Sequence, residues 1–142
     1  MKKNSFLQTS SQTVGPFFAY GLTAEQYQYD LPSLITGNLR KIEIHGEPIS
    51  IKGHIFDGNG DALNDAMIEI CQADPKGIYS TDPNGDFFGF GRTGTGSNAE
   101  KSFNFHTYKP GKIKEDFAPH INIIIFARGM LNHMFTRMYF PE

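Results

Sequence analysis

The sequence predicts a mainly β fold, an antiparallel β-sandwich preceded by an irregular N-terminal arm. Three observations lead to this prediction. Short runs with apolar residues at every second position recur from residue 41 onward. Turn-forming Gly, Pro, Asn and Asp residues separate these runs, most clearly at Asp57–Asp61. Very little of the chain has the apolar period of a helix.

We expect two parts: an arm over residues 1–40 and a sandwich core over residues 41–142. The arm has no clear strand pattern, and Pro32 limits any helix within it to a turn or two. Because such an arm cannot support itself, it must lie on the core or on another chain.

The first half of the core carries three expected strands. Lys41–His45 alternates apolar and polar side chains. Ser50–Phe56 does the same and runs into the Asp57–Asp61 turn, which indicates a hairpin. Ala66–Gln72 then places three apolar side chains on one face.

The second half carries four more. Phe87–Arg92 is a short run rich in Phe and Gly, and Ser102–Tyr108 places two Phe side chains on one face before the break at Lys109–Gly111. His120–Ala127 is almost continuously apolar, which is typical of a strand buried on both faces. His133–Phe140 is the last expected strand.

Composition narrows the class of protein. The formal net charge of −2 gives no reason to expect nucleic acid or a membrane as partner. No apolar run reaches the ~18–20 residues that span a bilayer, and no apolar stretch follows the basic start as in a secretory signal. Cys71 is the only cysteine, so an internal disulfide is excluded. We therefore expect a cytoplasmic protein.

Two short motifs look like ligand-binding loops but lack the right context. Gly89–Gly94 matches the glycine spacing of a dinucleotide site, yet no helix pattern follows it, so glycines of a tight β turn explain it better. Asp57–Asp61 opens like a calcium loop, but Ala62 and Ile68 occupy the positions that require Gly and Glu.

The five histidines raise the question of a metal site. His120 begins the most apolar strand, and the residue that shares its face two positions on is Asn122. A neutral amide is a poor ligand for Fe(III), so this strand offers at most one good donor. Cys71 has no nearby basic residue in sequence and is expected to act as a small buried hydrophobe.

Three stretches are similar to the intradiol ring-cleavage dioxygenases. Ser11–Phe17 resembles the SQTxGP segment near the start of family subunits. Ile51–Tyr79, continued by Phe88–Arg92, resembles the first strands of the family sandwich. Ala118–Phe140 resembles the APHIN, FARG and TRxYF motifs of alpha chains that act on protocatechuate, where beta chains carry RPAHIH.

The resemblance implies a non-haem Fe(III) enzyme of the beta-ketoadipate pathway that cleaves protocatechuate with O₂ to 3-carboxy-cis,cis-muconate. The family holds iron with two tyrosines and two histidines. Here His120 is retained, but Asn122 replaces the second histidine and Ile113 falls at or beside the second tyrosine. The short Ser80–Asp86 loop lacks the first tyrosine. The resemblance therefore implies that a beta subunit holds the Fe(III), and that this chain alone has no catalytic residues and is inactive.

What an alpha chain contributes in this family is one wall of the substrate pocket. The matching positions here are Thr13, Gly15 and Pro16 in the arm, and Arg128, whose guanidinium can pair with the carboxylate of an aromatic acid. The alternatives are that Arg128 closes a turn after a buried strand and that the arm residues pack against a partner.

Two departures from the family pattern affect the expected fold. Cys71 stands where the family has Trp, which leaves less bulk in the core. The sequence stops at Glu142, just after the last expected strand, so we expect a truncated sandwich that lacks the C-terminal strands of family alpha chains.

The alternatives to the alpha-chain interpretation are a prealbumin-like binding module and an inactive remnant. The arm motif and the FARG motif favour the alpha chain, because a generic sandwich needs neither.

Overall fold

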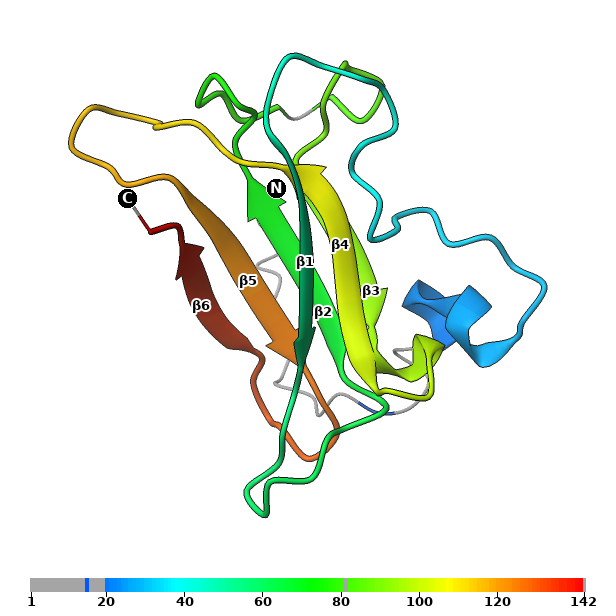
Figure 1. Ribbon diagram of the computed structural model, residues 1–142. Coiled ribbons are helices and arrows are strands. Elements are labelled where there is room, and N and C mark those ends of the chain that lie inside the picture. The colour runs from blue at the N-terminus through cyan, green and yellow to red at the C-terminus, as the bar shows by residue number, and fades with distance from the viewer. Residues whose placement is uncertain (1–14, 16–19, 81, 142) are drawn as a thin grey trace, which may run out of the picture.

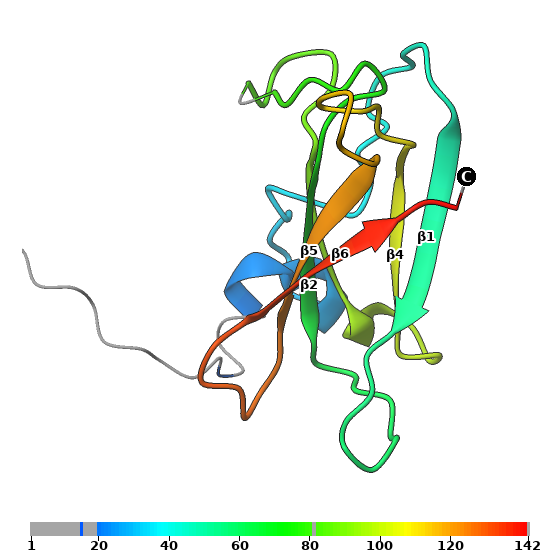
Figure 2. The same ribbon diagram turned by 90° about the vertical axis from the view of Figure 1, so that its left-hand side faces the viewer.

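The computed structural model describes residues 15, 20–80 and 82–141, and it shows two antiparallel sheets packed as a sandwich (Figure 1). The smaller sheet pairs β1 (Pro48–His54) with β4 (Ser102–Tyr108). The larger sheet has the strand order β3-β2-β5-β6. Its strands are β2 (Met67–Gln72), β3 (Phe90–Gly94), β5 (His120–Phe126) and β6 (Met134–Tyr139). The predicted β-sandwich is therefore confirmed, and Figure 2 shows its two layers from the side.

Alternating apolar residues on the facing strands fill the space between the sheets. Ile68 and Ile70 of β2, Phe105 of β4 and Ile121 of β5 are all at most 2% exposed and belong to one core cluster. Phe103 and Phe105 share the inner face of β4, as the period of two predicts. Burial of this apolar surface is the main source of stability.

The expected strand at Lys41–His45 is wrong. This segment is irregular and joins neither sheet. Its backbone groups are bound by a side chain instead: the Ile44 N–H donates to the Tyr108 hydroxyl and that hydroxyl donates to the Ile42 carbonyl, each at 3.4 Å. The alternation of apolar residues is real, but the hydrogen bonds of a sheet are replaced by those of a tyrosine.

The Asp57–Asp61 turn is confirmed, and it closes a short antiparallel hairpin. The Asp57 N–H donates to the Asp61 carbonyl at 3.0 Å, and the Leu63 N–H donates to the Ile55 carbonyl at 2.8 Å. One oxygen of Asp57 accepts hydrogen bonds from the backbone N–H groups of Asn59 and Asp61, at 2.9 Å each. β1 and β2, which flank the loop, belong to different sheets. A single bridge between Phe56 and Ala62 closes the loop, which carries the chain from one layer to the other.

The glycine-rich motif lies mainly within β3, which begins at Phe90 rather than Phe87 and leads into a 3-10 helix, Thr95–Ser97. A Cβ added to Gly89 would lie 2.0 Å from the Gln72 carbonyl oxygen. One added to Gly91 would lie 2.5 Å from the Leu39 side chain. These glycines allow close packing on the sheet, and no phosphate-binding helix follows them.

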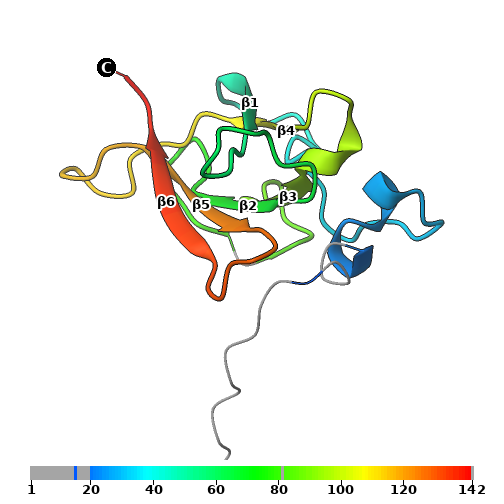
Figure 3. The ribbon, with the colours of Figure 1, turned by 90° about the horizontal axis from the view of Figure 1, so that it is seen from below.

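β5 is less buried than the sequence predicts. His120 and Ile121 are buried, but the remaining residues of the strand are half-buried. Figure 3 shows the reason: the smaller sheet lies over β2 and β3, while β5 and β6 extend beyond it. The expectation of burial on both faces is therefore wrong for most of this strand.

Residues 36–39 lie across the side of the sandwich where β3 and β4 adjoin. The Arg92 N–H of β3 donates to the Thr36 carbonyl at 3.1 Å. On β4, the His106 N–H donates to the Gly37 carbonyl, and the Leu39 N–H donates to the His106 carbonyl, both at 2.9 Å. Leu39 is buried in the core cluster. This segment thus connects the two sheets through backbone hydrogen bonds.

Candidate functional site

His120, at the start of β5, is buried on the outer face of the larger sheet. Its Nδ1 lies 2.9 Å from the carbonyl oxygen of Ala118. Since a carbonyl oxygen only accepts, Nδ1 donates this hydrogen bond, and Nε2 is the ring nitrogen left for another partner. His120 thus offers at most one nitrogen ligand.

Asn122 shares this face and stands between a phenol and a guanidinium. Its Nδ2 donates to the Tyr79 hydroxyl at 3.1 Å, and its Oδ1 accepts from Nε of Arg137 at 3.0 Å. The register explains the contact with Arg137, because that residue lies directly opposite Asn122 on β6. Both ends of the amide are therefore occupied.

Two acidic groups beside Asn122 are held in their neutral forms. Burial is the main cause that raises the pKa of the Tyr79 phenol above 10.0, and the Cys71 charge raises it further. The hydrogen bond from Asn122 and the charge of Arg137 lower this pKa, but by less. Burial also raises the pKa of the Cys71 thiol above 9.0. At neutral pH the cluster therefore contains a phenol and a thiol, without an anionic donor.

These residues do not fit Fe(III). That ion needs hard, anionic oxygen donors, whereas His120 offers a nitrogen and Asn122 a neutral amide. Arg137 adds a cation at hydrogen-bonding distance from that amide. In the part of the chain that the structure describes, no group of three His, Cys, Asp or Glu side chains could hold a metal ion.

Ile113, at the position compared with a second tyrosine, is half-buried. The segment that carries it packs on the turn before Tyr79: a Cβ on Gly77 would lie 1.9 Å from the Lys112 carbonyl oxygen and 3.3 Å from the Ile113 nitrogen. The structure thus brings Ile113 close to Tyr79 along the backbone. Its hydrocarbon side chain offers no ligand atom.

Arg128 lies just after β5, in a turn where Gly129 has a φ of +80°. Its side chain is 68% exposed, and its Nε forms an ion pair with Oδ2 of Asp65 at 3.0 Å. The other oxygen, Oδ1 of Asp65, is buried and has no hydrogen-bond partner among the described residues. Arg128 is therefore anchored at one nitrogen and exposed to solvent over most of its surface.

The structure does not bring Arg128 together with the His120 cluster. The two residues flank β5 at opposite ends, and at about 3.3 Å per residue their backbones are roughly 26 Å apart. No aromatic acid spans that distance. The two features cannot serve one small-molecule site within this chain.

The predicted arm residues are only partly visible. Gly15 is half-buried, and a Cβ added to it would meet nothing within 4 Å among the described residues. Thr13 and Pro16 lie outside the described residues. Nothing in the described part of this chain therefore requires glycine at position 15.

Sequence reasoning missed Asp65 and Arg137. The signal for both is strand register: Met67 pairs with Phe126, so two residues outward Asp65 comes opposite Arg128. Alternation of apolar residues predicts which face a side chain takes, but it does not predict which residue lies across from it.

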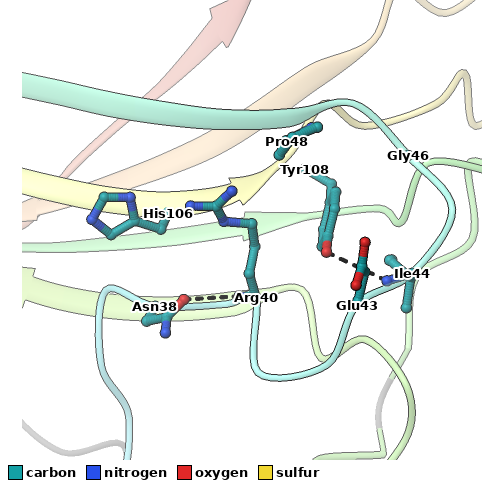
Figure 4. Close-up of a pocket in the computed structure, with 8 residues that line it drawn as sticks. All are labelled: Asn38, Arg40, Glu43, Ile44, Gly46, Pro48, His106 and Tyr108. Carbon is teal, nitrogen blue, oxygen red and sulfur yellow. Dashed lines mark hydrogen bonds between the residues drawn. The ribbon is translucent and has the colours of Figure 1, made fainter.

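Figure 4 shows a separate groove of about 450 Å³ on the smaller sheet. Its lining residues are Asn38, Arg40, Glu43, Ile44, Gly46, Pro48, His106 and Tyr108. The guanidinium of Arg40 extends toward β4 near His106, and Glu43 lies beside Tyr108 (Figure 4). The groove contains none of the predicted site residues and carries charges of both signs, so it is not assigned to the substrate.

No family model matches the chain. The protocatechuate 3,4-dioxygenase alpha chain of Burkholderia cepacia is 46% identical over 139 residues, covering 95% of this chain and 71% of that one. The alpha chain of Pseudomonas putida is 39% identical over 142 residues, covering 95% and 70%. The Burkholderia cepacia beta chain is 32% identical over 111 residues, covering 68% and 46%.

Among solved structures, the dioxygenase domain of a carbohydrate-binding fusion protein from Streptomyces sp. SirexAA-E has a TM-score of 0.64 and 28% identity. The match covers 75% of this chain and 65% of that chain. These similarities do not favour the prealbumin-like alternative. Since alpha chains match over nearly the whole sequence, this chain belongs to the protocatechuate 3,4-dioxygenase alpha-chain family.

Proposed function

We propose that this chain is the iron-free subunit of a two-chain enzyme that cleaves protocatechuate with O₂. In this proposal a beta subunit holds the Fe(III), and the present chain forms one wall of the substrate pocket. The observation that carries the proposal is the His120 cluster, where Asn122 and Arg137 leave no donor set that fits Fe(III). The relatives named alpha and beta chains support a division of labour between two subunits.

Arg128 is the residue proposed to recognise the substrate's carboxylate. Its planar guanidinium can donate two parallel hydrogen bonds to a carboxylate. The side chain is 68% exposed and lies at the far end of β5 from the His120 cluster. That position lets it reach a site on a neighbouring chain.

Thr13, Gly15 and Pro16 are proposed to complete this wall from the arm. Gly15 supports the assignment in one respect: an added methyl group would meet no atom of the described residues. If this wall contacts the substrate, we expect a Gly15→Ala variant of the complex to lose turnover.

We place the complex in the cytoplasm. The single cysteine, Cys71, is a free thiol, which fits a reducing compartment. No helix among the described residues is long and apolar enough to cross a membrane.

Co-expression with a beta chain tests the proposal. Complex mass, iron per chain and protocatechuate turnover are measured for this chain alone, the beta chain alone and both together. We expect iron in proportion to the beta chain, and full turnover only in the complex. Stoichiometric iron on this chain alone would contradict the assignment. Failure to associate with a beta chain would favour a binding module or an inactive remnant.

A further inference from the structure

We infer that Asp65 is a positioning residue for substrate recognition: it anchors Arg128 at Nε so that the two terminal nitrogens of the guanidinium face the carboxylate of the substrate. This inference rests on the proposed function of Arg128.

The placement of the pair follows from the register of β2 and β5. These strands are antiparallel, with Met67 opposite Phe126. Asp65 and Arg128 are each two residues beyond that pair. The two backbones therefore bring the carboxylate and the guanidinium together at the same end of the sheet, where β2 begins and β5 has ended. The separation of 3.0 Å between Arg128 Nε and Asp65 Oδ2 is that of a close ion pair.

Asp65 is a fixed anchor because its neighbour is locked in the core. Ala66 is 1% exposed, its N–H donates to Thr95 Oγ1 at 3.1 Å, and its carbonyl accepts from the Thr95 N–H at 2.9 Å. These contacts hold the backbone from which the Asp65 side chain extends. The anchor therefore belongs to the rigid sandwich, while Arg128 lies in an exposed turn.

The surroundings of the carboxylate favour pairing with Arg128. Oδ1 is buried without a hydrogen-bond partner among the described residues, so Asp65 has lost much of its hydration. The neighbouring Tyr27 is an uncharged phenol, because burial and then the Asp65 charge raise its pKa. A partly buried carboxylate gains most from a cation within ion-pair distance, and Arg128 supplies it.

The chemical consequence is preorganisation. An exposed arginine samples many rotamers, and a ligand must order it on binding. An ion pair at the inner nitrogen restricts the side chain but leaves the terminal fork for a second carboxylate. In the described part of the chain, no other acidic group lies within ion-pair distance of Arg128. Its free fork thus suits a carboxylate presented by another molecule.

The test uses the co-expressed complex with Asp65→Ala, Asp65→Asn and Asp65→Glu, and with Asp61→Ala as a matched exposed control. The KM and kcat for protocatechuate are measured beside the Kd for catechol, which lacks the carboxylate. For Asp65→Ala we expect KM to rise about three- to ten-fold, with kcat within two-fold and an unchanged Kd for catechol. Asp65→Asn should resemble Ala, Asp65→Glu should restore part of the loss, and Asp61→Ala should match the wild type.

A second comparison separates this inference from the proposed function. In an Arg128→Ala background, Asp65→Ala should cause no further rise in KM, because the residue it positions is gone. A further rise there, or an equal loss of catechol binding, would overturn the inference. If Arg128→Ala raises KM and Asp65→Ala does not, the inference fails and the proposed function stands. If neither raises KM, the assignment of Arg128 itself fails.

Complex mass and melting temperature verify that each variant folds and assembles. If the Asp65→Ala variant does not assemble, the isosteric Asp65→Asn variant is used for the test.

Discussion

Gln72 on β2 and Thr107 on β4 form a buried hydrogen bond that joins the two sheets, with Thr107 Oγ1 donating to Gln72 Oε1 at 2.9 Å. The other end of the amide is also paired, because Gln72 Nε2 donates to the Tyr108 carbonyl oxygen at 2.8 Å. Gln72 is 1% exposed and Thr107 is 0% exposed. A polar side chain thus holds the layers together at the centre of an apolar core.

Gln72→Leu should lower the free energy of unfolding by about 2–4 kcal/mol, because it leaves the Thr107 hydroxyl and the Tyr108 carbonyl buried without this partner. Urea denaturation measures the loss. Thr107→Val removes a single contact and should cost less. The double variant should cost less than the sum of the two changes. A loss below about 0.5 kcal/mol for Gln72→Leu would show that the bridge contributes little.

Gly77 and Gly60 form a matched pair for a second prediction. Both have a positive φ, +83° and +86°, but a Cβ meets the Lys112 carbonyl at 1.9 Å only at Gly77, while Gly60 is open. Gly60→Ala should cost about 1 kcal/mol from backbone strain alone. Gly77→Ala should cost several times more, about 3 kcal/mol or above, because the packed segment must move as well. Equal shifts in melting temperature would mean that this segment yields easily.

The third prediction concerns stability at alkaline pH. Burial raises the pKa of Cys71 above its ordinary 9.0, so the unfolded chain releases this proton at a lower pH than the folded chain does. Stability is therefore complete below pH 9 and falls as the pH rises through the folded-state value. Cys71→Ala should flatten this part of the profile in urea titrations. An unchanged slope would assign the alkaline loss to other groups, of which Tyr27 and Tyr79 also have a raised pKa.

The fourth prediction is that Arg128→Ala weakens substrate binding more than assembly. A charged hydrogen-bonding pair with the substrate contributes about 1.5–3 kcal/mol, so KM for protocatechuate should rise by roughly one to two orders of magnitude. Size-exclusion chromatography should show an unchanged complex, and Arg128→Lys should recover only part of the loss, because lysine lacks the planar fork. An unchanged KM would count against the assignment.

The sequence predicted well which side chains of a strand share a face, because alternation is a local property of each strand. It succeeded at Ile68 and Ile70, whose common face is the core side of β2. It failed at Ile42 and Ile44, where alternation is present but Tyr108, far along the chain, takes the backbone hydrogen bonds.

The residues of the candidate site could be predicted from the sequence only in part. Resemblance identified His120, Asn122 and Arg128, but it did not indicate Arg137 or Asp65. Both contacts depend on which residues lie across from each other in the assembled sheet. A shift of two residues would keep every side chain on its face and still separate both pairs, so alternation alone does not predict these contacts.

The hydrogen bonds of residues 36–39 should affect the rate at which the protein unfolds. Their hydrogen bonds reach Arg92 and His106, more than fifty residues further along the chain. The three bonds can all form only once β3 and β4 are both in place, so this segment should dock after the transition state of folding. Substitutions that weaken it should accelerate unfolding and leave the folding rate almost unchanged. The lifetime of the native state, more than its speed of formation, would then depend on this short connection.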